Sequence, residues 1–451
     1  MKLLSARRVK IIAIAALLSA PIISFGQDTQ EATKEPGKEV KEFYGRPSNW
    51  RPYDKRGINR FETSKEDSIA FEGPRVRFGA GFTQQYQNLN HENASKGEIP
   101  LYQMGPGFNL AQANLNIDFQ LADGIRVALE NYMSSRHHNE FWVKGGYIQF
   151  DKLPFKGKFW SDLMDITTIK IGHFEINYGD QHFRRTDGGN AIYNPFIENL
   201  IVDAFSTEIG AEVYLKKNGW FGMVGVTNGT INSSINKQAT DIDDNSKKFP
   251  ALFLKGGFDK QVTEDFRLRG SGSYYINNRS QRNVLYAGDR TGSNYWAVME
   301  AKGADLKAKF SSGRFAPGFT RNVRAIMLNG FGKYKGLELF GTYETAKGNA
   351  ATAADPDKRK MNQTALDVIY RIGKSENVFL GARFNNVSSE LPGYDDNVKI
   401  NRTAFGGGWF LTKNILLKGE IVNQKYKGWK EGDILDGGKF NGYVIEAVIG
   451  F

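Results

Sequence analysis

The stretch Asn109–Leu121, NLAQANLNIDFQL, decides the fold class of this 451-residue chain. Its odd-numbered residues from Ala111 onward are apolar, whereas its even-numbered residues from Gln112 to Gln120 are polar or charged. A period of two belongs to a β-strand, whose successive side chains point to opposite faces, and not to a helix with its period of 3.6. The stretch therefore predicts a strand with one apolar and one polar face.

The same alternation recurs along residues 73–451 and predicts a barrel domain there. We count sixteen strands, at about 75–88, 109–121, 124–135, 141–153, 167–177, 204–216, 219–229, 249–260, 265–277, 321–333, 336–347, 363–373, 376–387, 398–411, 414–427 and 441–451. Residues 295–299 and 304–310 could form two more strands, which would make eighteen. We expect one long folded loop at that place instead.

Two features favour a membrane-spanning barrel over a soluble β-sandwich. Charged residues occupy mid-strand positions on many successive strands, as a wet lumen requires, and short turns alternate with long polar loops. Outer-membrane barrels have short periplasmic turns and long external loops, and only a closed sheet satisfies every backbone group in lipid. We expect an all-β, transmembrane antiparallel barrel in the outer membrane of a Gram-negative bacterium. The abundance of Asn, Lys, Gly and aromatic residues suits a Bacteroidetes-type organism.

The N-terminal residues resemble an export signal followed by a tail. An apolar run, Ile11–Leu18, follows four basic residues and precedes small residues at Ser24 and Gly26, so residues 1–26 are expected to be a signal peptide. Residues 27–72 mix charges and hold few aliphatic side chains, which predicts a flexible periplasmic tail. The chain has no Cys, which excludes disulfides and a lipid-modified cysteine.

The last strand ends on an aromatic residue, Phe451. A terminal aromatic on an amphipathic final strand resembles the signal that the barrel assembly machinery recognises. We therefore expect Phe451 to act in assembly, with membrane lipid and that machinery as partners.

Two long loops are candidates for the constriction of the pore. The lumen of a sixteen-stranded barrel is too wide for side chains to fill, so an inward-folded loop must narrow it. In the loop 179–203, Arg184 and Arg185 would then form an anion-favouring constriction; a purely external loop is the alternative. The loop 276–320 holds Lys302 and Lys307 and could fold inward as well, or form a surface cap or a subunit contact.

The polar faces of the strands predict which charges line the lumen. The basic candidates are Arg75, Arg77, Arg126, Arg267, Arg269, Arg383 and Arg402. Acidic residues lie among them, so we expect a field across the lumen between basic and acidic walls. The net charge of +11 is not concentrated in a Lys/Arg-rich block, which argues against nucleic acid as a partner.

The sequence offers little support for an enzyme. A barrel hydrolase would need a Ser and a His together on an outer strand face, and no such pair is evident. The five His residues show no zinc spacing, and no phosphate-binding loop is present. We therefore predict no catalytic residue, no metal and no cofactor.

Two segments resemble the phosphate-selective porins O and P of Gram-negative bacteria. Residues 169–174, IKIGHF, are similar to that family's strand before the constriction loop, and residues 207–213, TEIGAEV, to the Gly-containing strand after it. The resemblance implies a sixteen-stranded porin, a homotrimer, and inward third and fifth loops. We expect passive diffusion of small hydrophilic solutes, with anions such as phosphate favoured. The alternative is a non-porin barrel, plugged by its loops, with a structural or secretion-associated role.

Overall fold

A computed structural model describes residues 50–63, 65, 70–94, 99–137, 140–186, 190–232, 235, 239–244, 247–309 and 311–451. By their contacts all of them belong to one unit, Arg46–Phe451. The signal peptide predicted for residues 1–26, and residues 27–49 of the predicted tail, lie outside the described residues.

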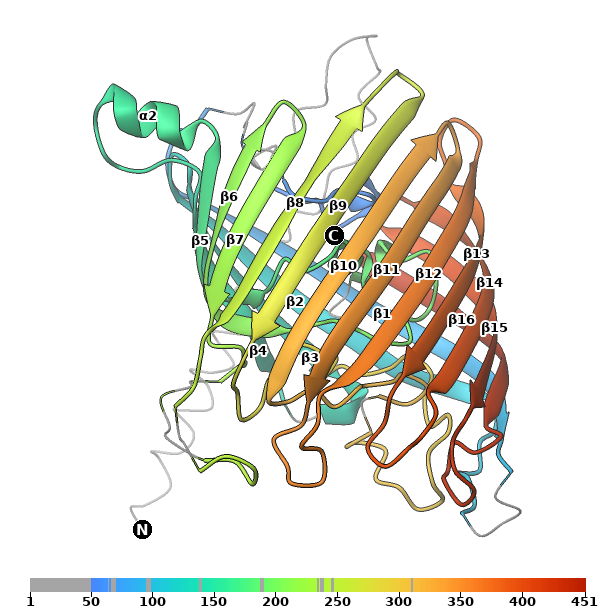
Figure 1. Cartoon of the computed structure of the whole chain (residues 1–451). Coiled ribbons are helices and arrows are strands. Elements are labelled where there is room, and N and C mark those ends of the chain that lie inside the picture. The colour runs from blue at the N-terminus through green and yellow to red at the C-terminus, as the bar shows by residue number, and fades with distance from the viewer. Residues whose placement is uncertain are drawn as a thin grey trace, which may run out of the picture. The chain divides into compact units, whose positions relative to one another are not determined.

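Sixteen antiparallel strands close into one barrel, in which β16 pairs with β1 (Figure 1). The strands are β1 (Arg75–Glu92), β2 (Gly107–Ala122), β3 (Ile125–Ser134), β4 (Trp142–Phe150), β5 (Thr167–Glu175), β6 (Thr207–Lys217), β7 (Trp220–Thr227), β8 (Ala251–Gln261), β9 (Phe266–Asn277), β10 (Asn322–Tyr334), β11 (Leu337–Asn349), β12 (Arg359–Ile372), β13 (Val378–Ser389), β14 (Val398–Thr412), β15 (Ile415–Lys427) and β16 (Lys439–Gly450). The predicted fold class and the count of sixteen are confirmed, and residues 295–299 lie in a loop.

The described helices are short. They are α2 (Lys158–Met164) and four 3-10 turns, namely η1 (Lys55–Gly57), η2 (Ser135–His137), η3 (Gln181–Arg184) and η4 (Asn190–Ile192). None of them is long and apolar enough to cross a membrane.

The alternation read from the sequence becomes an outer and an inner face. In β2 the polar side chains from Gln112 to Gln120 are buried inside the barrel, and the apolar ones between them face outward. Large apolar side chains such as Phe78, Leu380 and Phe405 are exposed on the outer wall. In water such a surface would be unfavourable, whereas in a bilayer it meets hydrocarbon.

The two ends of the barrel differ in their connections. Short turns join the strands at the end drawn uppermost in Figure 1, where only the β4–β5 connection, which carries α2, is long. The other connections gather at the opposite end. We call these the turn end and the loop end.

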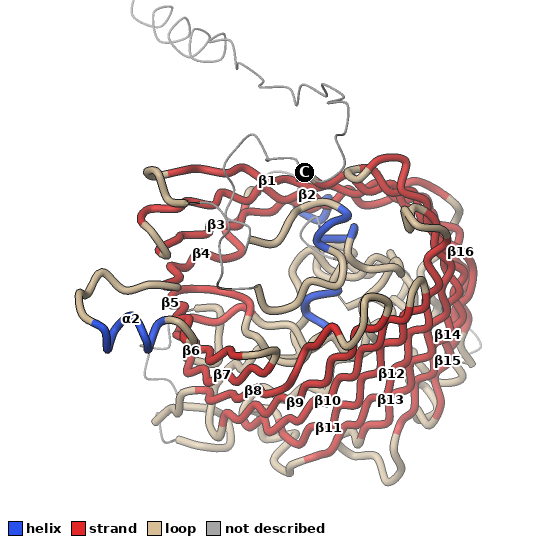
Figure 2. Tube along the Cα trace, turned by 90° about the horizontal axis from the view of Figure 1, so that it is seen from above, coloured by secondary structure: helices blue, strands red, loops and turns tan. Residues whose placement is uncertain are grey.

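Two long loops fold into the lumen. The described residues of loop 176–206 are almost all buried, and so are most of 283–299 in the loop between β9 and β10. Figure 2, seen from the turn end, shows loop segments and short helices inside the ring of strands. The prediction of inward-folded loops is confirmed.

The predicted flexible tail is wrong for residues 50–63, which lie inside the turn end. Trp50 and Phe61 are buried, and the Tyr53 hydroxyl donates to Asp118 Oδ2 on β2 at 2.8 Å. The backbone N–H of Lys55 donates to the carbonyl of Lys413 at 2.9 Å. Composition suggested disorder because the partners of these side chains are on strands far away in the sequence.

Candidate functional site

Arg184 and Arg185 lie inside the barrel, but buried ion pairs neutralise both. Arg184 Nη2 lies 3.5 Å from Asp367 Oδ2, and its Nη1 donates to the side chain of Asn59 at 3.2 Å. Arg185 Nη2 donates to Asp203 Oδ2 at 2.9 Å. Neither residue lines any of the three cavities described below. Because of this geometry, Arg184 and Arg185 are poor candidates for the constriction. Their ion pairs hold loop 176–206 in place instead.

The seven strand arginines face inward, and acidic or amide partners hold them. Arg77 pairs with Asp118, Arg267 with Asp259, Arg269 with Asp180, Arg383 with Asp367, and Arg75 with Glu72, while Arg126 lies 3.9 Å from Asp151 and Arg402 donates to Gln424. Of the seven, only Arg77 and Arg126 line a described cavity. Lys302 and Lys307 are exposed on the β9–β10 loop and line none.

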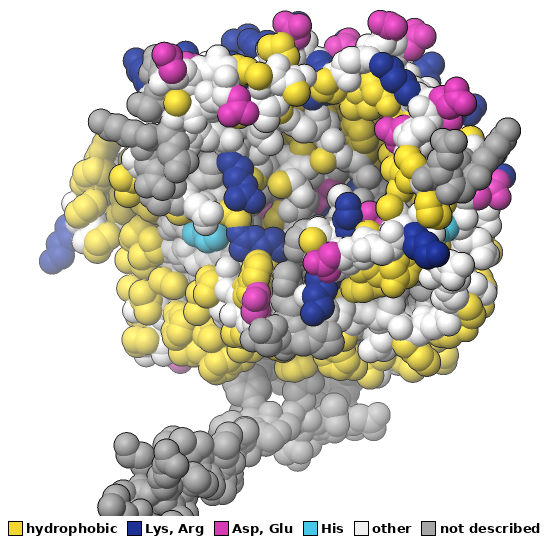
Figure 3. Space-filling view, turned by 90° about the horizontal axis from the view of Figure 1, so that it is seen from below, with side chains coloured by type: hydrophobic (Ala, Val, Ile, Leu, Met, Phe, Trp, Pro, Cys, Tyr) yellow, Lys and Arg dark blue, Asp and Glu magenta, His cyan; other side chains and the backbone are white. Residues whose placement is uncertain are grey.

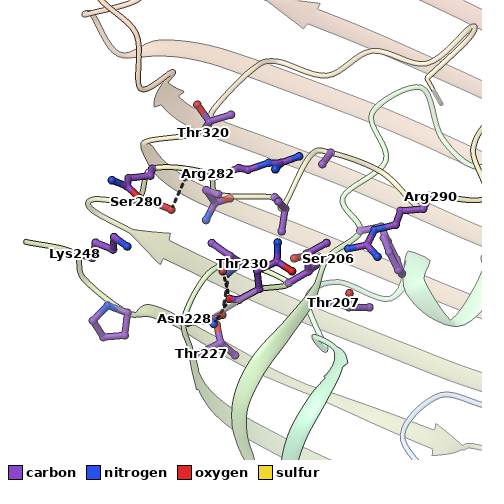
Figure 4. Close-up of a pocket in the computed structure, with 18 of the residues that line it drawn as sticks. Ser206, Thr207, Thr227, Asn228, Thr230, Lys248, Ser280, Arg282, Arg290 and Thr320 are labelled. Atoms are coloured by element: carbon purple, nitrogen blue, oxygen red, sulfur yellow. Dashed lines mark hydrogen bonds between the residues drawn. The ribbon is translucent and has the colours of Figure 1, made fainter. Parts of the chain in front are cut away.

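A cavity of about 1330 Å³ opens at the loop end, and we call it the loop-end cavity (Figure 4). Hydroxyl and amide side chains line part of it, among them Ser206, Thr227 and Asn228. Its described basic residues are Lys144, Lys247, Lys248, Arg279, Arg282 and Arg290, and its one described acidic residue is Asp289. Figure 3 views this end, where Lys and Arg side chains lie near the middle as well as on the rim, and hydrophobic side chains cover the lower flank.

Two of the basic residues that line the loop-end cavity have partners of different kinds. Arg279 pairs with Asp243 at 3.1 Å, and Arg290 lies over the ring of Trp142, 5.2 Å from its centroid. A cleft with low-dielectric walls and an excess of one sign of charge raises the local concentration of the opposite ion. The described lining of the loop-end cavity carries such an excess, with six basic residues against one acidic residue.

A second cavity of about 280 Å³, the interior cavity, lies next to the first. Lys144 and Thr207 line both, so these two side chains stand where the cavities meet. The Lys144 ammonium is almost fully buried, 3.3 Å from Asp289 Oδ2 and 3.5 Å from Glu130 Oε1. Like the loop arginines, Lys144 has acidic partners, but unlike them it lines two cavities, and this position makes it the better candidate for the constriction.

A β-bulge places Lys144 in the lumen. Glu130 on β3 pairs with Gly145 on β4, whereas the next residue, Asn131, pairs with Val143, so Lys144 is the extra residue between them. A bulge reorients a side chain and disrupts the alternation locally. Alternation in the sequence therefore does not identify Lys144 as a lumen residue, although the neighbouring Gly145-Gly146 pair is a signal for a bulge.

His182 also lines the interior cavity, but it adds no charge there. Burial, and after it the nearby Lys255, lowers the pKa of the His182 imidazole well below its ordinary value. Its Nε2 lies 2.8 Å from Asn177 Oδ1. Within the described part of the chain, no three His, Cys, Asp or Glu side chains form a group that could hold a metal ion.

A third cavity of about 1190 Å³, the turn-end cavity, lies under the β2–β3 and β4–β5 connections. Trp50 and Arg126 line both this cavity and the interior cavity. Its described charges nearly balance, with Lys65, Arg126, Lys152 and Lys158 against Asp123, Asp151 and Asp165. The interior cavity thus shares lining residues with both of the others, and α2 forms part of the lining of the turn-end cavity.

No protein-family model matches this chain, and no curated protein matches its sequence. Solved structures do match it. The anion-selective porin from Comamonas acidovorans has a TM-score of 0.52 and 11% identity, over 84% of this chain and 100% of that chain. The outer membrane channel DcaP of Acinetobacter baumannii has a TM-score of 0.50 and 12% identity, over 85% and 99%. At such identities the similarity shows the fold alone: this chain has the β-barrel fold of outer-membrane channels.

Proposed function

We propose that this protein is a passive outer-membrane porin for small hydrophilic anions. The observation that carries the proposal is the loop-end cavity, where the described basic residues outnumber the single described acidic one, Asp289. Solutes enter this cavity, pass Lys144 and Thr207, and continue along the interior and turn-end cavities. Selection rests on size and on charge at the narrow place between cavities, and no chemical step takes place.

Phosphate-like anions are the solutes that suit this path. The cavity offers ammonium and guanidinium groups beside hydroxyl and amide donors such as Thr227 and Asn228. Such donors can replace the water around an oxyanion. The resemblance of residues 169–174 and 207–213 to the phosphate-selective porins points to the same class.

The proposal includes an orientation and a route to the membrane. Residues 1–26 direct export, the long loops face the exterior of a Gram-negative cell, and Phe451 is read by the assembly machinery. The backbone of Phe451 exchanges two hydrogen bonds with Ala80 of β1, at 2.7 and 2.9 Å, which joins the end of the chain to the closing seam of the barrel. A homotrimer and a Bacteroidetes-type host belong to the same proposal.

Ion selectivity of the purified protein in a planar bilayer tests the proposal. We expect discrete single-channel conductance and, under a salt gradient, a reversal potential shifted toward the anion. A cation preference would refute the anion assignment. A correctly folded barrel with no conductance would refute the porin assignment.

A non-porin barrel is the second candidate, and the filling of the lumen favours it. Loop 176–206, residues 283–299 of the β9–β10 loop and residues 50–63 occupy the interior. Such a plugged barrel could serve a structural or secretion-associated role. It would show no conductance and would copurify with a stable large partner.

A further inference from the structure

Residues 50–63 lie across the turn end of the lumen and are fastened to the wall on opposite sides. Tyr53 bonds to Asp118 on β2, whereas the amide of Asn59 donates to Glu338 Oε1 on β11 at 2.8 Å. Each strand of the barrel pairs with the strands before and after it in the sequence. The strands β2 and β11 are therefore far apart around the barrel. The segment therefore bridges the lumen.

A buried ionic cluster holds the C-terminal part of the segment. Glu62 Oε1 lies 3.0 Å from Lys255 Nζ on β8, and its Oε2 lies 2.7 Å from Arg269 Nη2 on β9. Burial alone would raise the pKa of the Glu62 carboxyl, but Lys255 and Arg269 hold it below its ordinary value. The carboxylate stays ionised at neutral pH, so these ion pairs persist and the segment remains seated.

Trp50, at the N-terminal end of the described segment, stands between two cavities. Its side chain lines both the interior cavity of about 280 Å³ and the turn-end cavity of about 1190 Å³, and only 3% of the residue is exposed. The guanidinium carbons of Arg77 and Arg126 lie 5.1 and 5.6 Å from its ring centroid. Cation–π contacts of this kind hold an aromatic ring in a defined orientation.

We propose that Trp50 is a built-in stopper, which closes the passage between the interior and turn-end cavities and limits the size of the solutes that pass. The inference rests on the proposed porin function and adds a second narrow place to it. At the loop-end side Lys144 selects by charge. At the turn-end side Trp50 selects by size, because an indole ring fills space without adding a charge.

Conductance of Trp50→Ala is the direct test, with Trp429→Ala as the matched control. Trp429 is also buried and packs against Tyr426, but it lines none of the three cavities. We expect a severalfold higher single-channel conductance for Trp50→Ala, an intermediate value for Trp50→Phe, and the wild-type value for Trp429→Ala. Wild-type conductance in Trp50→Ala would overturn the stopper while leaving the porin assignment intact.

A labelling experiment tests the stopper without relying on ion flow. The chain has no Cys, so Ala128→Cys, on the wall of the interior cavity, introduces a single thiol. In the folded full-length protein, a charged water-soluble thiol reagent should react severalfold faster when Trp50→Ala is added than when Trp429→Ala is added. Equal rates would overturn the stopper. If neither variant conducts, the porin assignment fails, and the labelling rates still decide on Trp50.

Discussion

The lumen has two sides that handle charge differently. On the side of β10–β16, the two inward loops pack against the wall, and buried cations meet acidic partners, as Arg383 does with Asp367 and Lys418 with Glu446. On the side of β3–β7, three cavities share lining residues, and in the loop-end cavity the described basic residues exceed the acidic ones. The same residue types therefore form buried ion pairs on one side and line cavities on the other.

The difference follows from the cost of burying charge. A charge without water must have a partner, since an isolated buried ion costs several kcal/mol or more. A charge at the edge of a water-filled cavity keeps its hydration and can remain in excess. The number of arginines in a strand is therefore a poor guide to ion selectivity. Whether solvent lies beside those arginines is a better one.

The largest effect is expected on the stability of the protein, from breaking an ion pair on the side of β10–β16. Asp367→Asn leaves Arg383, whose Nε donates to Asp367 at 2.6 Å, and Arg184 without their carboxylate. We expect about 3–5 kcal/mol lower free energy of unfolding, the usual cost of removing one partner of a buried pair. Guanidinium unfolding followed by tryptophan fluorescence measures it.

The control for this variant is Asp265→Asn. Asp265 forms an exposed pair with Lys335 at 4.0 Å, and such surface pairs are worth only about 0–1 kcal/mol. Equal losses of unfolding free energy in the two variants would mean that buried ion pairs do not stabilise the side of β10–β16.

An intermediate effect is expected at the meeting point of two cavities. Lys144→Gln removes the ammonium and leaves Glu130 and Asp289 in place, so the anion-to-cation permeability ratio should fall severalfold. Arg185→Gln, on loop 176–206, should leave that ratio unchanged. Reversal potentials under a salt gradient measure both, and a larger shift in Arg185→Gln would restore the loop arginines as the constriction.

The smallest effect is expected at the mouth of the loop-end cavity. The double variant Lys248→Gln, Arg282→Gln should lower anion preference modestly at low salt. The change should vanish near 1 M salt, where the Debye length is about 3 Å. Lys302→Gln with Lys307→Gln is the matched control, because these exposed lysines line no described cavity. A salt-independent shift would contradict a screened, long-range effect.

The strands were predictable because each carries its own evidence. In β2 the alternation from Ala111 to Gln120 is visible in the sequence and reappears as the outer and inner faces. Inward folding of loop 176–206 was also predictable, since a sixteen-stranded lumen needs filling. The roles of Arg184 and Arg185 were not, because the acids that neutralise them, Asp367 and Asp203, could not be assigned from spacing.

By itself the sequence determined the closed barrel, its sixteen strands and its apolar outer wall. The period of two is visible in each strand separately. The sheet must close because every backbone group needs a hydrogen-bond partner in lipid. The tertiary structure decided which charges face water. Lys144 reaches the lumen through a bulge in the β3–β4 pairing, and Trp50 reaches it because its segment finds partners on distant strands. Such contacts depend on register and on the closed shape of the barrel, and no single stretch of sequence encodes either.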